Sequence, residues 1–279
     1  MAGNLLTTKE FVEKYGLMAK KSLGQNFLLD ANITDKIVRL SLQEQKLLNF
    51  CEQTVAEIGP GPGGLTQAVL RQNPNKMIAI EMDERCLQIL SEIKAVYPQL
   101  EIVSGDALTF DWKQAVKQNG KLHILSNLPY NISVVLLTQW LEQIDNFKSM
   151  TLMFQKEVGD RISAVPGTKD YGRISVISQL QCQVIKLFDL PPTCFVPAPK
   201  IWSSVLLFLP RDNVVEPALL SKVEMLTGLA FGQRRKMIRQ SLKTVPHISE
   251  YLEELSILPT LRAEDLSPTD FLNIAKRLV

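Results

Sequence analysis

Residues 127–130 read Asn-Leu-Pro-Tyr and follow the short apolar run at 123–126. The carboxamide of Asn127 supplies a hydrogen-bond acceptor, Pro129 fixes φ and carries no N–H, and Tyr130 presents an aromatic face for stacking. These groups could hold a flat, weakly nucleophilic amine, such as the exocyclic NH2 of a base, against an electrophile. An ordinary turn after a strand is the alternative, and the tetrapeptide alone leaves both interpretations open.

A glycine cluster closes the strand that we predict at 54–58. Gly59, Gly61 and Gly64 match the G-x-G-x-x-G spacing of dinucleotide sites, and Glu81 stands where the ribose-binding acid of that fingerprint is expected. Glycine lets the backbone turn tightly and approach a ligand closely. The pattern therefore predicts a cofactor that contains a nucleoside.

The chemistry around the glycines favours S-adenosylmethionine over a dinucleotide. Pro60 and Pro62 remove two N–H donors from a loop that would have to wrap a pyrophosphate, and the Glu57 carboxylate suits a cationic aminoacyl group better than a diphosphate. A nicotinamide oxidoreductase remains the alternative of a different class. For S-adenosylmethionine we expect ribose contacts from Glu81, packing on adenine from Met82, and an acceptor for the adenine amino group from Asp106.

Strand-like runs alternate with helical patterns between about residues 54 and 155. Units of this length predict an α/β fold with a doubly wound, Rossmann-like parallel sheet. Ligands in such sheets bind beyond the carboxyl ends of the strands. Four candidate residues fall there, one per strand: Gly59, Glu81, Asp106 and Asn127. The predicted strands are 54–58, 77–80, 102–103, 122–125 and 150–154, and the predicted helices are 64–71, 84–96 and 134–141.

The pattern changes after Leu187. A proline-rich loop at 190–199 and a strand at 203–209 precede helical patterns from about Pro217. We therefore expect a small helical C-terminal domain after a boundary near residue 211. The expected domains are a catalytic domain over 1–210, whose segment 1–50 contributes to RNA and cofactor binding, and an RNA-binding domain over 211–279.

Bulk composition narrows the class of protein. The net charge of +2 permits a nucleic-acid partner only if positive charge is clustered. The four cysteines are scattered without metal-site spacing, so we expect no metal. No apolar run approaches the roughly 20 residues of a membrane span, and the N-terminus lacks a signal-peptide core. We expect a cytoplasmic protein, monomeric and without a membrane partner.

Five motifs together resemble those of the ribosomal RNA adenine dimethylases. Residues 57–63 are similar to the first motif of class I S-adenosylmethionine-dependent methyltransferases, and 127–130 resemble the amine-methylation motif of the dimethylases. Residues 20–28 are similar to the N-terminal motif of that family, 195–205 to its late target-pocket motif, and 233–236 to its C-terminal basic motif. The resemblance extends from about residue 20 to 240 and implies a class I methyltransferase fold that uses S-adenosylmethionine.

The resemblance also implies a substrate. Members of the family that act on the small ribosomal subunit methylate N6 of two adjacent adenosines in the loop of the 3′-terminal hairpin of 16S rRNA, giving dimethyladenosines. The implied partner is 16S rRNA within the 30S subunit or its precursor, and the implied role is in ribosome biogenesis. The basic motif at 233–236 favours this branch over the 23S rRNA methylases of macrolide resistance. An assembly factor with secondary methylation is a further alternative.

Site residues follow from the same resemblance. The Asn127 side-chain oxygen and the carbonyl of Leu128 or Pro129 would accept the two N6–H bonds, while Tyr130 stacks on one face of the base and Phe195 on the other. Cys194 departs from the second aromatic residue of many relatives, so stacking on that face depends on Phe195 alone. The cofactor residues implied are Asn26, Leu28, Gly59, Gly61, Glu81, Met82, Asp106 and Asn127.

Basic residues form two candidate RNA contacts. Lys20 and Lys21 lie in the N-terminal motif. Between residues 233 and 243 there are five basic residues and no acidic one, and we predict that Lys236, Arg239 and Lys243 share one helix face. A solvated helix face is the alternative. The residues expected to bind RNA are Lys20, Lys21, Arg234, Arg235, Lys236 and Arg239.

Overall fold

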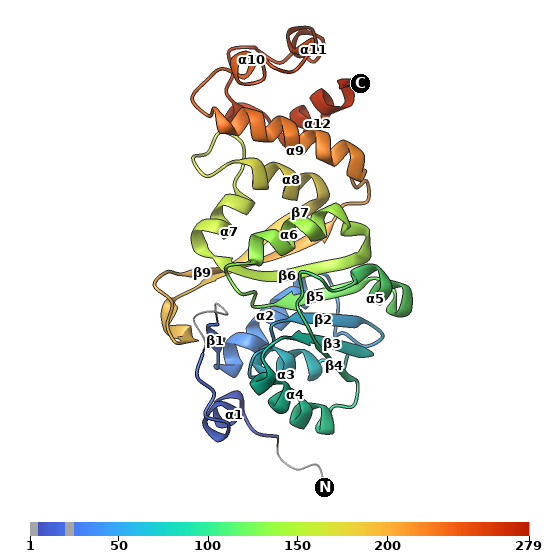
Figure 1. The fold of residues 1–279 in the computed structure, drawn as a ribbon, viewed down its shortest axis with the longest axis vertical. Coiled ribbons are helices and arrows are strands. Elements are labelled where there is room, and N and C mark those ends of the chain that lie inside the picture. The colour runs from blue at the N-terminus through green and yellow to red at the C-terminus, as the bar shows by residue number, and fades with distance from the viewer. Residues whose placement is uncertain (1–4, 20–24, 279) are drawn as a thin grey trace. The chain divides into compact units, whose positions relative to one another are not determined.

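The computed structural model describes residues 5–19 and 25–278. Their main element is a seven-stranded sheet with the order β4-β3-β2-β5-β6-β9-β7 (Figure 1). Neighbouring strands from β4 to β6 are parallel, and β9 is antiparallel to β6. The strands are β2 (Thr54–Ile58), β3 (Lys76–Glu81), β4 (Leu100–Ser104), β5 (Leu122–Ser126), β6 (Phe147–Gln155), β7 (Cys182–Leu190) and β9 (Ser203–Pro210).

This topology confirms the predicted doubly wound fold. The strand order reverses between β2 and β5, and ligands bind at such a switch point, beyond the carboxyl ends of the strands. All five residues of β2 and of β5 are buried, so both faces of the central strands are covered. The helices in this part of the chain are α1 (Thr8–Lys14), α2 (Ala31–Glu44), α3 (Gly64–Leu70), α4 (Glu84–Val96), α5 (Trp112–Asn119) and α6 (Ser133–Glu142).

The core beside the sheet explains why these segments fold as they do. Val55 of β2 and Met77 of β3 pack in one cluster with Ile37 of α2 and Ile89 of α4. Buried residues recur at spacings of three and four along both helices, since Thr34 and Ser41 are buried beside Ile37 in α2 and Ile93 beside Ile89 in α4. Burial of these apolar faces against the strands provides the main stabilising term.

A two-residue ladder lies outside the main sheet. β1 (Phe27–Leu28) pairs antiparallel with β8 (Phe195–Val196), so Leu28 stands opposite Phe195. Neither strand was predicted, because two residues carry no readable periodicity. The ladder joins the N-terminal motif to the late motif, which are far apart in the sequence.

Contacts divide the chain into two compact units. The first comprises residues 1–138, 145–156 and 186–208, and the second comprises 139–144, 157–185 and 209–279. The predicted boundary near 211 thus lies close to one of the contact boundaries, but residues 157–185 belong with the C-terminal helices because α8 packs on α9 and α12. The helices concerned are α7 (Lys156–Ser163), α8 (Arg173–Gln181), α9 (Pro217–Gly232), α10 (Ile238–Ser241), α11 (Ile248–Glu254) and α12 (Pro268–Arg277).

Two kinds of feature are absent from the described part of the chain. None of its helices is long and apolar enough to cross a membrane. Within residues 5–19 and 25–278 there is also no group of three or more His, Cys, Asp or Glu side chains that could hold a metal ion.

Candidate active site

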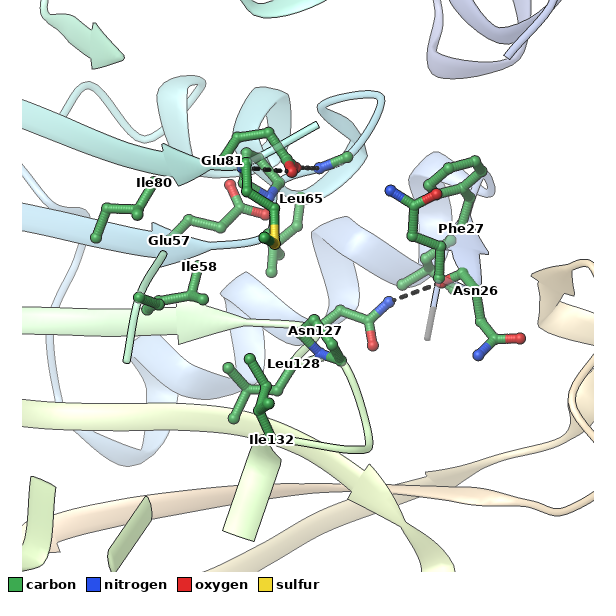
Figure 2. A pocket seen from close by; sticks show the side chains of 18 of the residues that line it. Asn26, Phe27, Glu57, Ile58, Leu65, Ile80, Glu81, Asn127, Leu128 and Ile132 are labelled. Carbon is green, nitrogen blue, oxygen red and sulfur yellow. Dashed lines mark hydrogen bonds between the residues drawn. The ribbon is translucent and has the colours of Figure 1, made fainter. Parts of the chain in front are cut away.

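A pocket that is open to solvent lies at the carboxyl ends of β2, β3 and β5 in the first unit (Figure 2). It gathers residues that are far apart in the sequence. The tetrapeptide that follows β5 faces the glycine turn after β2 and the short strand β1. Among the residues that line it are all the expected cofactor residues, Asn26, Leu28, Gly59, Gly61, Glu81, Met82, Asp106 and Asn127, together with Leu128, Pro129 and Tyr130.

The glycine turn is built for close approach. Gly61 has a φ of +55°, which L side chains rarely adopt, and a Cβ there would lie 3.2 Å from the Phe27 ring. Gly64 begins α3, and a Cβ on it would lie 2.6 Å from the Leu28 carbonyl oxygen. β1 therefore packs directly against the turn because these two positions carry no side chain.

Backbone N–H groups hold the Glu81 carboxylate in place. One oxygen accepts from Gly61 N at 3.0 Å, and the other accepts from Met82 N at 2.9 Å and Asp83 N at 2.8 Å. Burial raises the pKa of Glu81, while these three hydrogen bonds act in the opposite direction. The carboxylate lies at the pocket surface, where ribose hydroxyls could donate to it.

Glu57 lies deeper in the pocket, and the protonation state of its carboxyl group differs from the one we expected. Its side chain accepts a hydrogen bond from Thr66 Oγ1 at 2.6 Å and is almost fully buried. Burial raises the pKa of Glu57 to about 8, and the negative charge of Glu81 adds to the shift. At neutral pH the Glu57 carboxyl is thus mostly protonated, whereas we had expected a carboxylate for a cationic ligand.

The Asn127 carboxamide is oriented by the N-terminal motif. Its Nδ2 donates to the Asn26 carbonyl oxygen at 3.1 Å (Figure 2). Asn127 Oδ1 has no hydrogen-bond partner among the described residues and remains available as an acceptor. Just before it, Ser126 Oγ donates to the Ile58 carbonyl at 2.6 Å, which ties the end of β5 to the end of β2.

The two aromatic residues assigned to stacking differ in exposure. Tyr130 lines the pocket, and its hydroxyl lies 2.7 Å from Ser203 Oγ at the start of β9. Burial raises the pKa of Tyr130, so the hydroxyl stays neutral. Phe195 does not line the pocket, because its ring packs in the core with 2% of its surface exposed. In this conformation Phe195 offers no free face to a base, and only Tyr130 does.

Two remaining residues that we expect at the cofactor, Met82 and Asp106, are exposed to solvent. Met82 is 56% exposed, unusual for a large apolar side chain, and is free to pack on a flat ligand. Asp106 is exposed, and its Oδ1 accepts from Leu108 N at 2.9 Å. This bond orients the Asp106 carboxylate at the end of β4.

The N-terminal motif is anchored beside the pocket by residues that the sequence analysis did not identify. Asp83 accepts from Gln25 Nε2 at 3.1 Å and from Arg85 Nη2 at 2.6 Å. Arg85 also donates to the Met18 carbonyl at 2.9 Å. The Arg85 hydrogen bonds hold the pKa of Asp83 well below its usual range. One sequence signal could have identified Asp83: it is an acidic residue two positions after Glu81, and it N-caps α4.

The basic residues fall into three groups. Lys20 and Lys21 lie outside the described residues. Arg234 donates to Glu264 at 2.6 Å and to the Thr168 carbonyl at 3.2 Å, so it holds the second unit together. Of the six residues expected to bind RNA, Arg235, Lys236 and Arg239 are exposed and form no ion pair with a described residue.

The predicted common helix face of Lys236, Arg239 and Lys243 is wrong. α10 comprises only Ile238–Ser241, residues 233–235 form turns, and Lys236 lies in a bend. Met237 N-caps α10 with extended φ and ψ angles and forms a β-bridge with Arg262. This local pairing prevents a continuous helix over the basic residues.

The switch-point pocket, with its glycine turn, fixed acid and Asn-Leu-Pro-Tyr segment, defines a class I methyltransferase. Comparison with known proteins narrows this class. The family model described as ribosomal RNA adenine dimethylase matches residues 16–279, and the chain belongs to that family.

Relatives and solved structures agree with this family. The chain is 46% identical over 274 residues to ribosomal RNA small subunit methyltransferase A of Agrobacterium fabrum, covering 97% of this chain and 96% of that one. It is 47% identical over 271 residues to the protein of the same name from Brucella anthropi, covering 96% and 94%. Among solved structures, a dimethyladenosine transferase from Plasmodium falciparum has a TM-score of 0.72 at 25% identity, with 88% and 94% covered. The 23S rRNA methyltransferase ErmE has a TM-score of 0.67 at 23% identity, with 91% and 99% covered, which shows the fold alone.

Proposed function

We propose that this protein transfers methyl groups from S-adenosylmethionine to N6 of two adjacent adenosines in the 3′-terminal hairpin loop of 16S rRNA. The observation that carries the proposal is the Asn127 carboxamide, whose nitrogen is held by Asn26 and whose oxygen is available to an incoming amine. Relatives at 44–47% identity over nearly the whole chain carry the name of small-subunit rRNA methyltransferases, which supports this substrate.

The pocket residues fit S-adenosylmethionine. The Glu81 carboxylate can accept from the ribose hydroxyls, and the Gly61 turn lets the backbone come close. Met82 can pack on adenine, and Asp106 can accept from its amino group. Pro60 and Pro62 offer no N–H to a pyrophosphate, which disfavours a dinucleotide. The cofactor would supply an electrophilic methyl group.

The protein residues then position and localise the amine. N6 of adenine is a poor nucleophile because its lone pair is delocalised into the ring. Asn127 Oδ1 and the carbonyl of Leu128 or Pro129 accept the two N6–H bonds, so the nitrogen becomes more tetrahedral and its lone pair points at the methyl group. Tyr130 stacks on the splayed base, which must leave its own helical stack. Positioning of this kind can supply much of a rate enhancement without a strong base.

The available side chains agree with a mechanism that needs no general base, because N6 becomes cationic on methylation and then readily loses its proton to water. No histidine or cysteine lines the pocket among the described residues. His123 is buried in β5 with Nδ1 2.8 Å from Ser149 Oγ, and burial lowers its pKa to about 4. A neutral amide at position 127 can also accept from an amine that has already received one methyl group, which is compatible with dimethylation.

Nucleotide mapping tests the proposal. The protein is incubated with labelled S-adenosylmethionine and, separately, with 30S and 50S subunits from a strain that lacks the modification. We expect label in 30S only, on two adjacent adenosines of the 3′-terminal hairpin loop, as N6-dimethyladenosine. Label in 50S only would favour the 23S rRNA alternative, and stable 30S binding without label would favour an assembly factor.

A further inference from the structure

A group of exposed apolar side chains lies on two segments that meet at Tyr130. Val134 and Val135 begin α6, while Ile201 and Trp202 immediately precede β9. The hydrogen bond between Tyr130 and Ser203 joins the two segments. We call Val134, Val135, Ile201 and Trp202 the rim patch. None of them lines the pocket itself, so the mechanism above does not use them.

Trp202 is the largest side chain of the rim patch, and its backbone is fixed. Its carbonyl accepts from Lys156 N at 2.8 Å. The next residue, Ser203, stands opposite Gln155 in the β6–β9 ladder and contacts Tyr130. Trp202 is nevertheless 49% exposed. An aromatic face held out to solvent by an ordered backbone loses little entropy when a partner covers it.

The charge around Trp202 favours a polyanion. Lys200 is exposed and forms no ion pair with a described residue. Lys156 and Lys186 both pair with Asp189, at 3.6 and 2.9 Å, so one carboxylate is shared by two ammonium groups. Lys200 therefore adds a cation without an ion pair among the described residues, two positions before Trp202. An aromatic face beside positive charge is the combination with which proteins bind unpaired nucleotides.

We propose that Trp202 is a stacking platform for an unpaired base beside the target adenosine, while the target base itself enters the pocket and stacks on Tyr130. This inference rests on the proposed function, because it needs an RNA substrate with unpaired neighbours. The Tyr130–Ser203 bond places the two aromatic residues on connected segments. Trp202 is then a substrate-positioning residue that selects a loop over a base-paired stem.

Kinetics with three variants test the platform. Trp202→Ala should raise the KM for under-methylated 30S subunits roughly 5- to 100-fold, the loss expected for one base stack, with little change in kcat and in S-adenosylmethionine affinity. Trp202→Phe retains an aromatic face and should restore most of the KM. Leu48→Ala is the matched control, because Leu48 is 97% exposed and precedes β2, at the opposite end of the strands from the pocket.

Fluorescence gives an independent readout. The chain has three tryptophans, and Trp112 and Trp140 are 4% and 0% exposed, so quenching by an added ligand reports on Trp202. A naked hairpin RNA with two adjacent loop adenosines should quench this emission, and a fully paired RNA of equal length should quench it much less.

The outcomes separate the two proposals. If the wild-type protein does not methylate 30S subunits, the proposed function fails. If it does, and Trp202→Ala has the KM of wild type or loses no more than Leu48→Ala, the platform is wrong. Quenching by whole subunits but not by the hairpin RNA would indicate a ribosomal protein as the occupant and would also overturn it.

Discussion

The pocket of the first unit and the basic segment 233–243 of the second unit show two ways in which a sequence encodes binding. In the pocket, the Glu81 carboxylate is held by three N–H groups, and the Asn127 carboxamide is oriented by the Asn26 carbonyl. In the basic segment, Arg235, Lys236 and Arg239 are exposed without ion pairs among the described residues. A small ligand with defined donors needs fixed geometry, whereas a polyanion needs mainly charge.

This difference determines how large an effect we expect from substitutions in each region. Buried groups of the pocket depend on neighbours that cannot be replaced by water, so their loss has large and specific effects. Exposed cations act through a screened field, so each contributes little by itself. The predictions that follow probe this contrast in order of decreasing effect.

The largest effect is expected at Glu57. Its pKa of about 8 in the folded protein lies above the usual 4.5, so the native state binds more protons than the unfolded state between these values. This contribution to stability is present below pH 4.5 and is lost as pH rises through 8. Between pH 5 and 8 it amounts to about 3 kcal/mol. Glu57→Gln should remove that slope in denaturant unfolding, and parallel curves for the two proteins would contradict the assignment.

The second largest effect is expected for Glu81→Gln. The substitution turns an NH2 group toward at least one of three backbone donors and removes the charge that ribose hydroxyls would meet. Affinity for S-adenosylmethionine should fall roughly 10- to 100-fold by calorimetry. Asp106→Asn is the matched control, because the Asp106 side chain accepts from a single backbone N–H among the described residues. Its loss should be a few-fold, and equal losses in both variants would remove the special role of Glu81.

Neutralising the basic segment should have a smaller effect. In the triple variant Arg235→Ala, Lys236→Ala, Arg239→Ala, binding to 30S subunits should weaken by about tenfold at low salt, and the slope of log affinity against log salt should fall by up to about one per contacting cation. The methylation rate at saturating subunit should not change.

Arg234→Ala provides the contrast within the same segment. Its ion pair with Glu264 is partly exposed, so the free energy of unfolding should fall by about 0.2–1 kcal/mol, with little change in the salt slope. If Arg234→Ala changed the salt slope as much as the triple variant, the structural role that we assign to Arg234 would be wrong.

Sequence reasoning was most successful where spacing is dictated by the backbone. β2 and α4 begin and end at the predicted residues, and the four strand ends converge as expected. Glycine and proline restrict the main chain in the same way in any context. Those positions therefore carry information that does not depend on tertiary contacts.

The failures share a physical cause. Burial of Phe195 and the protonation of Glu57 depend on what packs around them, and single-residue chemistry does not contain that information. The helix predicted across the basic segment does not form, because Met237 instead forms a β-bridge with Arg262. The β1–β8 ladder joins residues more than 150 positions apart, and no local sequence pattern predicts it.

The central claim is that Asn127 Oδ1 accepts a hydrogen from the target amine. The most direct test is the single-turnover rate of methyl transfer in Asn127→Ala, with S-adenosylmethionine and 30S subunits both saturating. We predict a rate at least about 100-fold below wild type, while the Kd for S-adenosylmethionine stays within about tenfold. A single-turnover rate within a few-fold of wild type would contradict the account.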